Sequence, residues 1–195
     1  MNEQAPTVFV CGLGRCGTSL IMKMLHAGGM PVYADNHASF EHDDLIHPRE
    51  IDEVIPPIVG RAAKILDPQR WIWGKYPHLK VIWMDRDNHQ QAKSQLKLLR
   101  MMGGFTIPSG ALRGIEKSLA PDTGAAVQVI LDSGAQILRL QFEDVLAKPF
   151  QAAEKISAFV GGLDGLSMAK VVIPRSALCA DGLDIEREAC LREMK

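Results

Sequence analysis

The stretch VFVCGLGRCGTSL, residues 8–20, restricts the possible fold more than any other part of the chain. It begins with β-branched and aromatic residues typical of a buried strand, continues with three glycines, and leads into TSLIMKMLHA, whose apolar side chains recur at helical spacing. Glycines here allow a tight turn that aims successive backbone N–H groups into one concavity, to which the following helix adds its positive end. The stretch therefore predicts a strand, a loop that binds a phosphate or sulfonate group, and a helix; a simple glycine turn is the alternative.

Seven residues are predicted to form this anion site: Gly12, Gly14, Arg15, Cys16, Gly17, Thr18 and Ser19. The glycines supply backbone N–H groups, Arg15 supplies a fixed charge, and Thr18 and Ser19 supply hydroxyl donors at the start of the helix. Cys16 could be a reactive thiol in such a loop, but a small buried side chain in the place of a serine is the preferred interpretation.

Strands and helices alternate along the rest of the chain. LKVIWMD (79–85) and QILRLQF (136–142) predict two more buried strands, and strong helical patterns follow them at 88–102 and 150–160. Such alternation predicts an α/β domain of the P-loop type, with a mainly parallel sheet flanked by helices in three α/β/α layers. Ligands of such sheets bind at the carboxyl ends of the strands, where the loops after the first and second strands emerge.

Three further segments connect these elements. PVYADNHASFEHDDL (31–45) is polar and acidic and is predicted to be an irregular connector. Residues 47–67 have a helical pattern that Pro56 and Pro57 are expected to kink or to restart. Residues 111–133 are predicted to form a pair of helices interrupted near APDTG.

The net charge of the chain is close to zero, so any anion site has to be a local arrangement of cations and N–H groups. With 195 residues the chain can bury a sizeable core, and we expect a single domain over residues 1–195. Its net charge of −1 excludes a general affinity for nucleic acid or an anionic membrane surface. No apolar run approaches the roughly 20 residues that cross a bilayer, the first residues do not resemble a signal peptide, and the cysteines form no paired motif. We therefore expect a cytoplasmic protein without a membrane span.

The identity of the anion narrows the possible chemistry. A P-loop kinase or triphosphatase needs a lysine where this loop has Thr18, and a hydroxyl group on Mg²⁺. Asp85, at the end of VIWMD, could serve as a magnesium-binding aspartate, although apolar strands that end in aspartate are common. A cysteine phosphatase is excluded, because neither Cys11 nor Cys16 is followed six positions later by an arginine. A small-molecule or nucleotide kinase with a degenerate loop is therefore one candidate.

Three segments, in order along the chain, resemble the sulfotransferase family. GLGRCGTSL is similar to the family's 5′-phosphosulfate loop, which in bacterial members typically reads G-x-x-R-S-G-T-S-L. VIWMDRDNHQQAKSQL resembles the 3′-phosphate motif, with Arg86 at the strand end and Ser94 two helical turns later, so that both can reach one phosphate. FEDVLAKPFQAAEKISAFVG is similar to the acidic strand-end motif and its helix, so the resemblance covers about residues 7–162.

The resemblance implies a sulfotransferase that takes the sulfonate of 3′-phosphoadenosine 5′-phosphosulfate (PAPS) and transfers it to a hydroxyl or amine. No metal is expected, because the transferring group carries less charge than a phosphoryl group, and loop N–H groups with cations suffice to stabilise it. Arg15, the loop backbone, Thr18 and Ser19 would hold the 5′-phosphosulfate. Arg86 and Ser94 would hold the 3′-phosphate.

A general base has to deprotonate the acceptor. DNHASFEHDDLIHP resembles the segment after the first helix in the bacterial and Golgi-type branch of the family, where a glutamate lies near the reacting sulfonate. Glu41 is therefore the first candidate, and His37 and His42 are alternatives, since a neutral imidazole is a natural base at pH 7. A solvated loop residue without a catalytic role is the plain interpretation of each.

WIWGKYPHLKV resembles the W-G-x-K-x-P segment that precedes the 3′-phosphate strand in many bacterial members. Lys75 would then reach the bridging oxygen and stabilise the leaving group, with a plain surface lysine as the alternative. Trp71 and Trp73 could stack on the adenine, but packing in the core is the preferred interpretation for both.

The sequence departs from the family pattern at several places. Cys16 replaces the usual serine, Asn88 replaces a common proline, and Phe142 stands where tyrosine is frequent, but none of these changes removes a charge that the mechanism needs. The C-terminal part offers only Arg175 and Gly182 for the basic, glycine-bearing loop that closes over the 3′-phosphate in cytosolic members. A relative that binds the nucleotide without turnover is therefore a third candidate, and the acceptor stays open among sugars, lipids, phenols and peptides.

Overall fold

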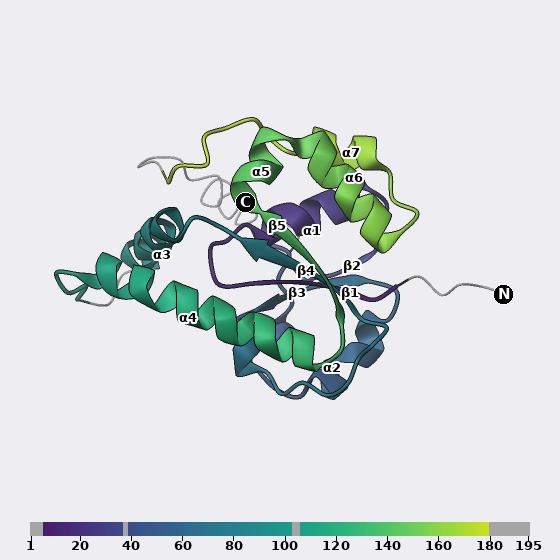
Figure 1. Cartoon of the computed structure of the whole chain (residues 1–195), viewed down its shortest axis with the longest axis horizontal. Helices are drawn as coiled ribbons and strands as arrows, with labels where there is room; N and C mark the ends of the chain where they lie inside the picture. Colours follow the sequence, from purple (N-terminus) through teal and green to yellow (C-terminus); the bar gives the residue numbers. More distant parts are fainter. Residues whose placement is uncertain (1–5, 37–38, 103–105, 180–195) are drawn as a thin grey trace.

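The computed structural model of the chain describes residues 6–36, 39–102 and 106–179 (Figure 1). At its centre lies a five-stranded sheet in which all neighbouring strands pair in parallel, in the order β2-β3-β1-β4-β5. The strands are β1 (Val8–Gly12), β2 (Val32–Tyr33), β3 (Ala62–Leu66), β4 (Lys80–Asp85) and β5 (Gln136–Gln141). Because β1 lies between β3 and β4, the loop after β1 emerges between the carboxyl ends of these two strands.

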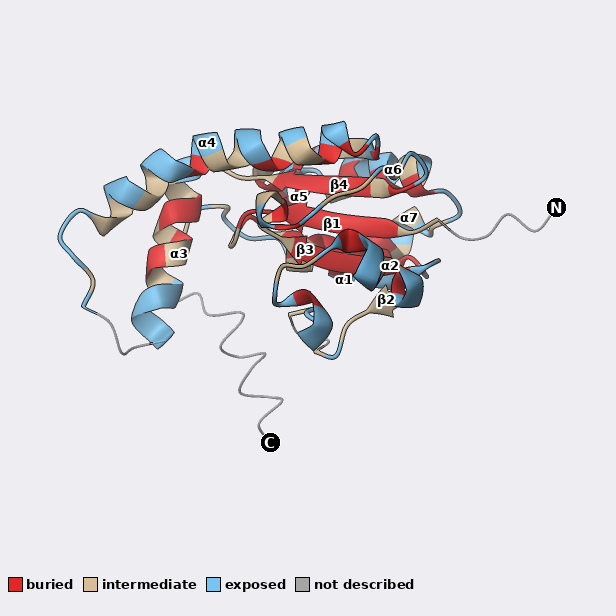
Figure 2. Ribbon diagram, turned by 90° about the horizontal axis from the view of Figure 1, so that it is seen from below, coloured by how far each residue is buried: buried red, intermediate tan, exposed pale blue. Residues whose placement is uncertain are grey.

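Helices cover both faces of the sheet, which confirms the predicted α/β fold and its layers (Figure 1). The helices on one face are α1 (Thr18–Ala27), α5 (Phe142–Ala147), α6 (Pro149–Val160) and α7 (Gly165–Lys170). The other face carries α2 (Ile51–Ile58) and α4 (Ala111–Asp132). Helix α3 (Asn88–Met102) lies beyond the carboxyl ends of the strands and packs against the first half of α4 (Figure 2). Two 3₁₀ turns, η1 (Asp43–Leu45) and η2 (Pro68–Arg70), complete the described elements.

The core consists of two apolar clusters, one on each face of the sheet. Val8 and Val10 pack with the residues of α1 and α6, whereas Phe9 and Trp83 pack with those of α2 and α4. This division follows from the alternation of side chains along a strand. Strand β1 is buried along its whole length (Figure 2), and such two-sided burial explains why the central strands read as continuous apolar runs.

The prediction that residues 47–67 are helical is wrong for the second half of the segment. Helix α2 ends at Ile58, and Ala62–Leu66 forms strand β3, which pairs with β1 on one side and β2 on the other. The run AAKIL is short and apolar on both faces, so its periodicity does not distinguish a buried strand from a buried helix. The hydrogen bonds that make it a strand come from residues far away in the sequence.

Two smaller predictions also need correction. Residues 111–132 form one continuous helix, α4, in which Pro121 causes no interruption. Pro121 and Lys117 are both exposed, so water can bind the carbonyl oxygen that lacks its N–H partner. The connector over residues 31–45 is less irregular than predicted, because it contains the short edge strand β2 and the turn η1.

Candidate functional site

The loop between β1 and α1 emerges at the carboxyl ends of the parallel strands, where sheets of this kind bind their ligands. Two glycines are required by close contacts. A Cβ on Gly12 would lie 2.3 Å from the sulfur of Cys16, and a Cβ on Gly17, whose φ is 109°, would lie 2.4 Å from the ring of Phe142. The loop is therefore folded tightly back on itself, as the glycine pattern predicts.

Side chains of α3 orient the peptide groups at the tip of this loop. Gln91 donates from Nε2 to the carbonyl oxygens of Leu13 (3.2 Å) and Gly14 (3.0 Å), and Gln95 also donates to Gly14 (2.8 Å). In a trans peptide the N–H points opposite to the carbonyl group, so the N–H groups of Gly14 and Arg15 are aimed away from α3. Neighbouring N–H groups that point to one side form a concavity suited to an anionic oxygen.

A buried lysine lies beside the loop, on the neighbouring strand β3. The Lys64 side chain is only 3% exposed, and its ammonium lies 2.7 Å from Glu41 Oε1. It also donates to the Ser39 carbonyl (2.6 Å) and to the Ser19 hydroxyl (3.3 Å). Burial of an ammonium is tolerated when such partners compensate the lost hydration. Because Ser19 is the second residue of α1, Lys64 fixes a positive charge where the loop joins the helix.

The segment before Glu41 holds this residue toward the loop. The Glu41 carbonyl accepts the N–H of Asp35 (2.9 Å), and Phe40 is buried at a positive φ of 55°. The hydroxyl of Ser19 donates to the Ser39 carbonyl (2.9 Å), which ties the segment to the first turn of α1. The Glu41 side chain is 48% exposed, so its carboxylate faces both the buried ammonium and the solvent from which an acceptor would approach.

The structure brings Arg15, Arg86 and Ser94 together. Arg15 donates from Nε to the Ser94 hydroxyl (3.1 Å), and Arg86 donates from Nη1 to the Arg15 carbonyl (2.9 Å). Arg86 also donates from Nη2 to the carbonyl of Ala177 in the segment after α7 (3.1 Å). The strand-end arginine and the helix serine therefore both lie beside the loop, and the C-terminal segment reaches the same place.

Positive charge accumulates around Arg86. Its guanidinium lies 4.6 Å from the centroid of the Phe142 ring, and the guanidinium of Arg175 lies 5.3 Å from the same centroid. Burial lowers the pKa of Arg86, the charges of Arg175 and Arg15 lower it further, and Glu143 opposes them. Among the described residues, Arg86 Nε is buried without a hydrogen-bond partner. A phosphate group at this place would supply both the missing acceptor and a neutralising charge.

Two of the predicted loop residues turn their side chains inward. Thr18 is 4% exposed and Cys16 is 1% exposed. Burial raises the pKa of the Cys16 thiol to about 12, so the thiol is protonated near neutral pH. Cys16 therefore fills the interior of the loop beside Gly12, in agreement with the preferred interpretation of this residue.

The structure does not bring Lys75 to the loop. Lys75 precedes β4, on the amino-terminal edge of the sheet, and its ammonium donates to the carbonyl of Asp132 (2.6 Å), the last residue of α4. A cation at the C-terminal end of a helix interacts favourably with the helix dipole. The loop lies at the opposite edge of the sheet, so a contact between Lys75 and the leaving group is not formed.

Trp71 and Trp73 also take structural positions. Their indole N–H groups donate to the carbonyl oxygens of Leu66 (3.2 Å) and Pro68 (2.9 Å), which flank the turn after β3. Trp71 is 5% exposed. Trp71 therefore lies in the core, and Trp73 is partly buried against the same apolar cluster, which agrees with the preferred interpretation of both residues.

His42 has both ring nitrogens engaged. Its Nδ1 accepts the N–H of Asp44 (3.1 Å), its Nε2 lies 3.3 Å from Asp35 Oδ1, and its ring stacks on Tyr33 at 3.8 Å. With Nδ1 accepting and Nε2 donating, the imidazole has no lone pair left for an acceptor proton. His37, the other alternative base, lies outside the described residues, as does Gly182.

Asp85 is not arranged as a metal ligand. Both of its carboxylate oxygens accept hydrogen bonds from Arg139, at 2.8 to 3.0 Å, and Oδ1 also accepts the Trp83 indole N–H (2.8 Å). The charge that would attract Mg²⁺ is therefore neutralised. Within residues 6–36, 39–102 and 106–179, no group of three or more His, Cys, Asp and Glu side chains is arranged to hold a metal ion.

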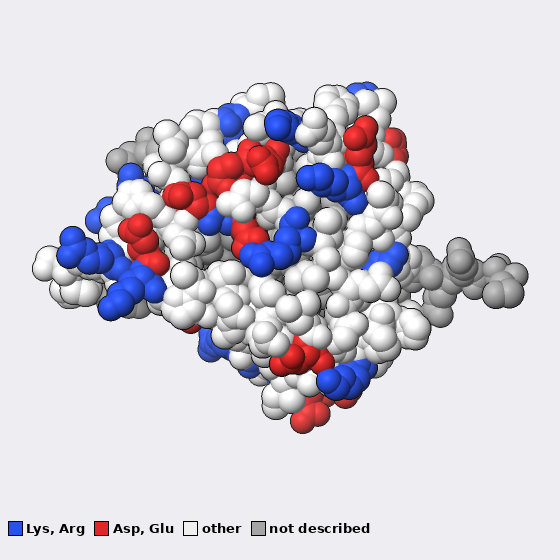
Figure 3. Space-filling view, in the orientation of Figure 1, with Lys and Arg blue, Asp and Glu red and all other residues white. Residues whose placement is uncertain are grey.

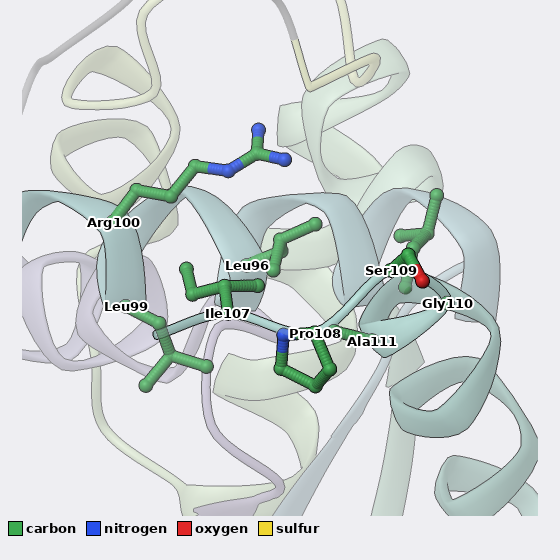
Figure 4. A pocket seen from close by; sticks show the side chains of 9 residues that line it. Leu96, Leu99, Arg100, Ile107, Pro108, Ser109, Gly110 and Ala111 are labelled. Carbon is green, nitrogen blue, oxygen red and sulfur yellow. The ribbon is translucent and has the colours of Figure 1, made fainter. Parts of the chain in front are cut away.

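Away from the loop, the described surface has an apolar cavity and a face of mixed charge. A cavity of about 640 Å³ opens between the end of α3 and the start of α4, and its walls are mainly apolar, with Arg100 nearby (Figure 4). None of its lining residues is acidic or a histidine. On the face seen in Figure 3, Lys and Arg side chains are interspersed with Asp and Glu. Of the helices described, none combines the length and the apolar character that crossing a bilayer requires.

Sequence reasoning missed three residues that shape the site, Lys64, Gln91 and Gln95. The available signal for Lys64 was a single charged residue inside the apolar run AAKIL. Once that run is recognised as a buried strand, a charged residue within it indicates a buried charge with specific partners. Gln91 and Gln95 are four residues apart and therefore share one face of α3. Nothing local indicates that this face meets the loop, since β4 and β1 have to pair first.

The fold and the loop define the chain as an α/β protein of the P-loop type. No protein-family model and no curated protein sequence matches it. Among solved structures it is similar to mouse sulfotransferase SULT7A1 complexed with PAP, with a TM-score of 0.56 and 14% identity, over 100% of this chain and 68% of that one. It is also similar to retinol dehydratase in complex with androsterone and the inactive cofactor PAP, with a TM-score of 0.55 and 15% identity, over 84% of this chain.

These similarities show a fold shared with sulfotransferase structures. The chain spans 68% of the length of the first and 62% of the length of the second. At such identities the activity and the acceptor of the two proteins do not carry over to this chain by similarity alone. They have to be argued from the site.

Proposed function

We propose that the protein binds PAPS and transfers its sulfonate to a hydroxyl or amine of an acceptor. The observation that carries the proposal is the Lys64 ammonium at the Ser19 hydroxyl, 3.3 Å away. In the phosphate loop of kinases and triphosphatases, the hydroxyl at this position binds Mg²⁺. An ammonium fixed at the same hydroxyl repels a second cation, and a sulfonate needs no metal because its charge is low enough for N–H groups and one ammonium to stabilise.

The two ends of the donor would occupy the two halves of the site. The N–H groups of Gly14 and Arg15 and the Lys64 ammonium would hold the 5′-phosphosulfate. Arg86 and Ser94 would hold the 3′-phosphate. Arg86 would then donate to the phosphate in place of the Ala177 carbonyl, and its buried Nε would gain an acceptor. The similarity to two structures that contain PAP supports a nucleotide with this pair of phosphates.

The chemical step would be an in-line displacement at sulfur. The oxygen or nitrogen of the acceptor attacks the sulfonate, the bond from sulfur to the 5′-phosphate oxygen breaks, and adenosine 3′,5′-bisphosphate leaves. The acceptor proton passes to the carboxylate of Glu41, which we propose as the general base. The Lys64 ammonium, 2.7 Å from that carboxylate, would stabilise the negative charge on the sulfonate oxygens during transfer.

The kinase alternative finds less support in the same residues. The position of the phosphate-binding lysine is taken by Thr18, which is buried, and the carboxylate of Asp85 is neutralised by Arg139. A relative that binds the nucleotide without turnover would have the same binding site. Only a measurement of transfer distinguishes it from an active enzyme.

Thermal unfolding with added ligands tests the proposal directly. A ligand that binds only the folded state at 100 times its Kd stabilises that state by about 2.7 kcal/mol. Adenosine 3′,5′-bisphosphate should raise the Tm without Mg²⁺, and transfer from labelled PAPS over a panel of acceptors should then identify turnover. Stabilisation by Mg·ATP without any response to the bisphosphate would contradict the proposal in favour of a kinase.

A further inference from the structure

The residue directly after β3 reaches the loop from the side opposite to α3. Strand β3 pairs with β1 so that Leu66 lies beside Gly12, and the N–H of Asp67 donates to the Gly12 carbonyl (3.1 Å). Asp67 has a φ of 49° and a ψ of 58°, in the left-handed region that only glycine and, less often, Asn and Asp enter without a large cost. The backbone of Asp67 is thus bent sharply at the edge of the loop.

The neighbours of Asp67 hold it in this conformation. The indole groups of Trp71 and Trp73 bind the carbonyl oxygens of Leu66 and Pro68, on either side of Asp67, and the Asp67 carbonyl itself accepts the N–H of Arg70 (2.9 Å). A residue kept in an unfavourable backbone region by so many bonds points to a functional requirement. The backbone at Asp67 is therefore held in one conformation beside the loop.

The bend delivers the Asp67 carboxyl to an N–H group of the loop. The Asp67 carboxyl lies near enough to the Gly14 N–H to interact with it, and Gln91 aims that N–H away from α3 by holding the Leu13 carbonyl. Burial raises the pKa of Asp67, while Arg70 and the Gly14 N–H oppose the rise and Asp122 on α4 adds to it. A negative group of the protein thus lies at one of the two N–H groups that face the anion site.

We propose that Asp67 selects the charge of the anion that the loop accepts, favouring a singly charged sulfonate over a doubly charged terminal phosphate. The inference rests on the proposed function and adds the residue that would separate PAPS from phosphate donors of the same shape. A terminal phosphate carries close to two negative charges near neutral pH, whereas a sulfonate carries one. The repulsion from a fixed carboxylate a few ångströms away is therefore about twice as large for the phosphate.

The test compares PAPS with adenosine 3′-phosphate 5′-diphosphate, which has a phosphate in place of the sulfonate. Calorimetry on the wild-type chain should show that PAPS binds tighter by on the order of tenfold. Asp67→Asn, which tolerates the same backbone region, should bring the two Kd values within about threefold by tightening the diphosphate. Asp122→Asn removes a nearby carboxylate that makes no contact with the loop N–H, so it serves as the control and should keep the preference.

A second variant and a second pair of ligands distinguish failure of this inference from failure of the proposed function. If Asp67→Asn does not fold, Asp67→Gly removes the carboxylate and fits the positive φ without strain, and it should lose the preference in the same way. If the wild-type chain binds neither nucleotide, the proposed function fails, and binding of inorganic pyrophosphate and of sulfate then tests Asp67 alone. Tighter binding of pyrophosphate relative to sulfate in the variant than in the wild-type chain supports the role of Asp67. If the ratio of the two Kd values is the same in the variant and in the wild-type chain, for the two nucleotides or for the two inorganic anions, the role of Asp67 is overturned.

Discussion

The ammonium of Lys64 lies 2.7 Å from the carboxylate of Glu41, across 23 positions of sequence. One partner comes from the buried strand β3 and the other from the half-exposed segment after β2. The pair places a fixed cation and a solvent-accessible carboxylate side by side at the start of α1. The proposed transfer would use the cation to stabilise the donor's charge and the carboxylate to take the acceptor proton.

Lys64→Met should abolish most turnover while it leaves the fold intact. Loss of one preorganised group that stabilises transition-state charge typically costs about 10²–10³ in kcat. Because the Glu41 carboxylate left behind is 48% exposed, water can solvate it and no buried unpaired charge remains, so the Tm should change by only a few degrees. Lys80→Met is the matched control, because Lys80 binds the carbonyl oxygens of Phe159 and Val160 at the other edge of the sheet. Near-normal turnover in Lys64→Met would remove this lysine from the mechanism.

Glu41→Gln should lower kcat by about 10²–10⁴, because the amide keeps the size of the side chain and cannot accept the proton. The affinity for adenosine 3′,5′-bisphosphate should change less than threefold, since the carboxylate faces the acceptor. Asp43→Asn removes a carboxylate from the same segment and should leave kcat unchanged. An active Glu41→Gln beside an inactive His42→Ala would assign the proton to His42.

Arg86→Ala should weaken binding of adenosine 3′,5′-bisphosphate by about 2–4 kcal/mol, through loss of a charge-assisted phosphate contact. Ser94→Ala should cost about 1 kcal/mol, because a neutral hydrogen bond is lost. Titration calorimetry measures both effects. Arg139→Ala, whose side chain pairs with Asp85 next to the site, should bind normally. Both losses should shrink for adenosine 5′-phosphosulfate, and equal losses with and without the 3′-phosphate would show that these residues do not bind that group.

Lys75→Ala should lower stability without affecting binding or turnover. The variant loses the interaction of an ammonium with the C-terminal end of α4, which is worth about 0.3–1 kcal/mol at an exposed helix end. Urea unfolding gives the loss of stability, and an assay with saturating PAPS gives kcat. A large drop in kcat with unchanged donor affinity would instead restore Lys75 as the residue that stabilises the leaving group.

Cys16 should resist alkylation in the folded protein. Its thiol is buried and its pKa is raised to about 12, and burial also raises the pKa of Cys11 well above its usual value. Iodoacetamide at pH 8 should therefore label the partly exposed Cys179 and spare Cys11 and Cys16, as mass spectrometry of peptides can show. In urea Cys11 and Cys16 should react as well. Rapid labelling of Cys16 in the native state would mean that its thiol is accessible in the loop.

Local sequence was sufficient for the parts of the site that lie within one strand–loop–helix unit. The tight fold of the loop at Gly12 and Gly17 follows from the glycine spacing, because a Cβ at either position would collide with Cys16 or Phe142. The nearness of Arg86 and Ser94 to each other follows from a strand end and two turns of the next helix, since 3.6 residues per turn set the spacing. The close contact at Gly12 and the nearness of Arg86 to Ser94 depend on residues fewer than ten positions apart, whereas the approach of Arg86 and Ser94 to the loop depends on the pairing of β4 with β1.

Local sequence was insufficient for β3 and for the residues that it carries. AAKIL becomes a strand because β1 and β2 supply its hydrogen bonds, and these partners are tens of residues away. Lys64 and Asp67 reach the loop only through this pairing, so reading residues 47–67 as helical concealed both.

Lys64 and Lys75, which lie on either side of the two tryptophans in the sequence, show most clearly what the tertiary structure decided. Sequence alone determined an α/β chain with a glycine loop between the first strand and the first helix, and by resemblance it selected Lys75 as the catalytic lysine. The order β2-β3-β1-β4-β5 sends Lys75 to the amino-terminal edge of the sheet and places Lys64 beside the loop. Strand order and register arise from hydrogen bonds and packing between distant segments, so no local pattern determines which of two lysines lies beside the loop.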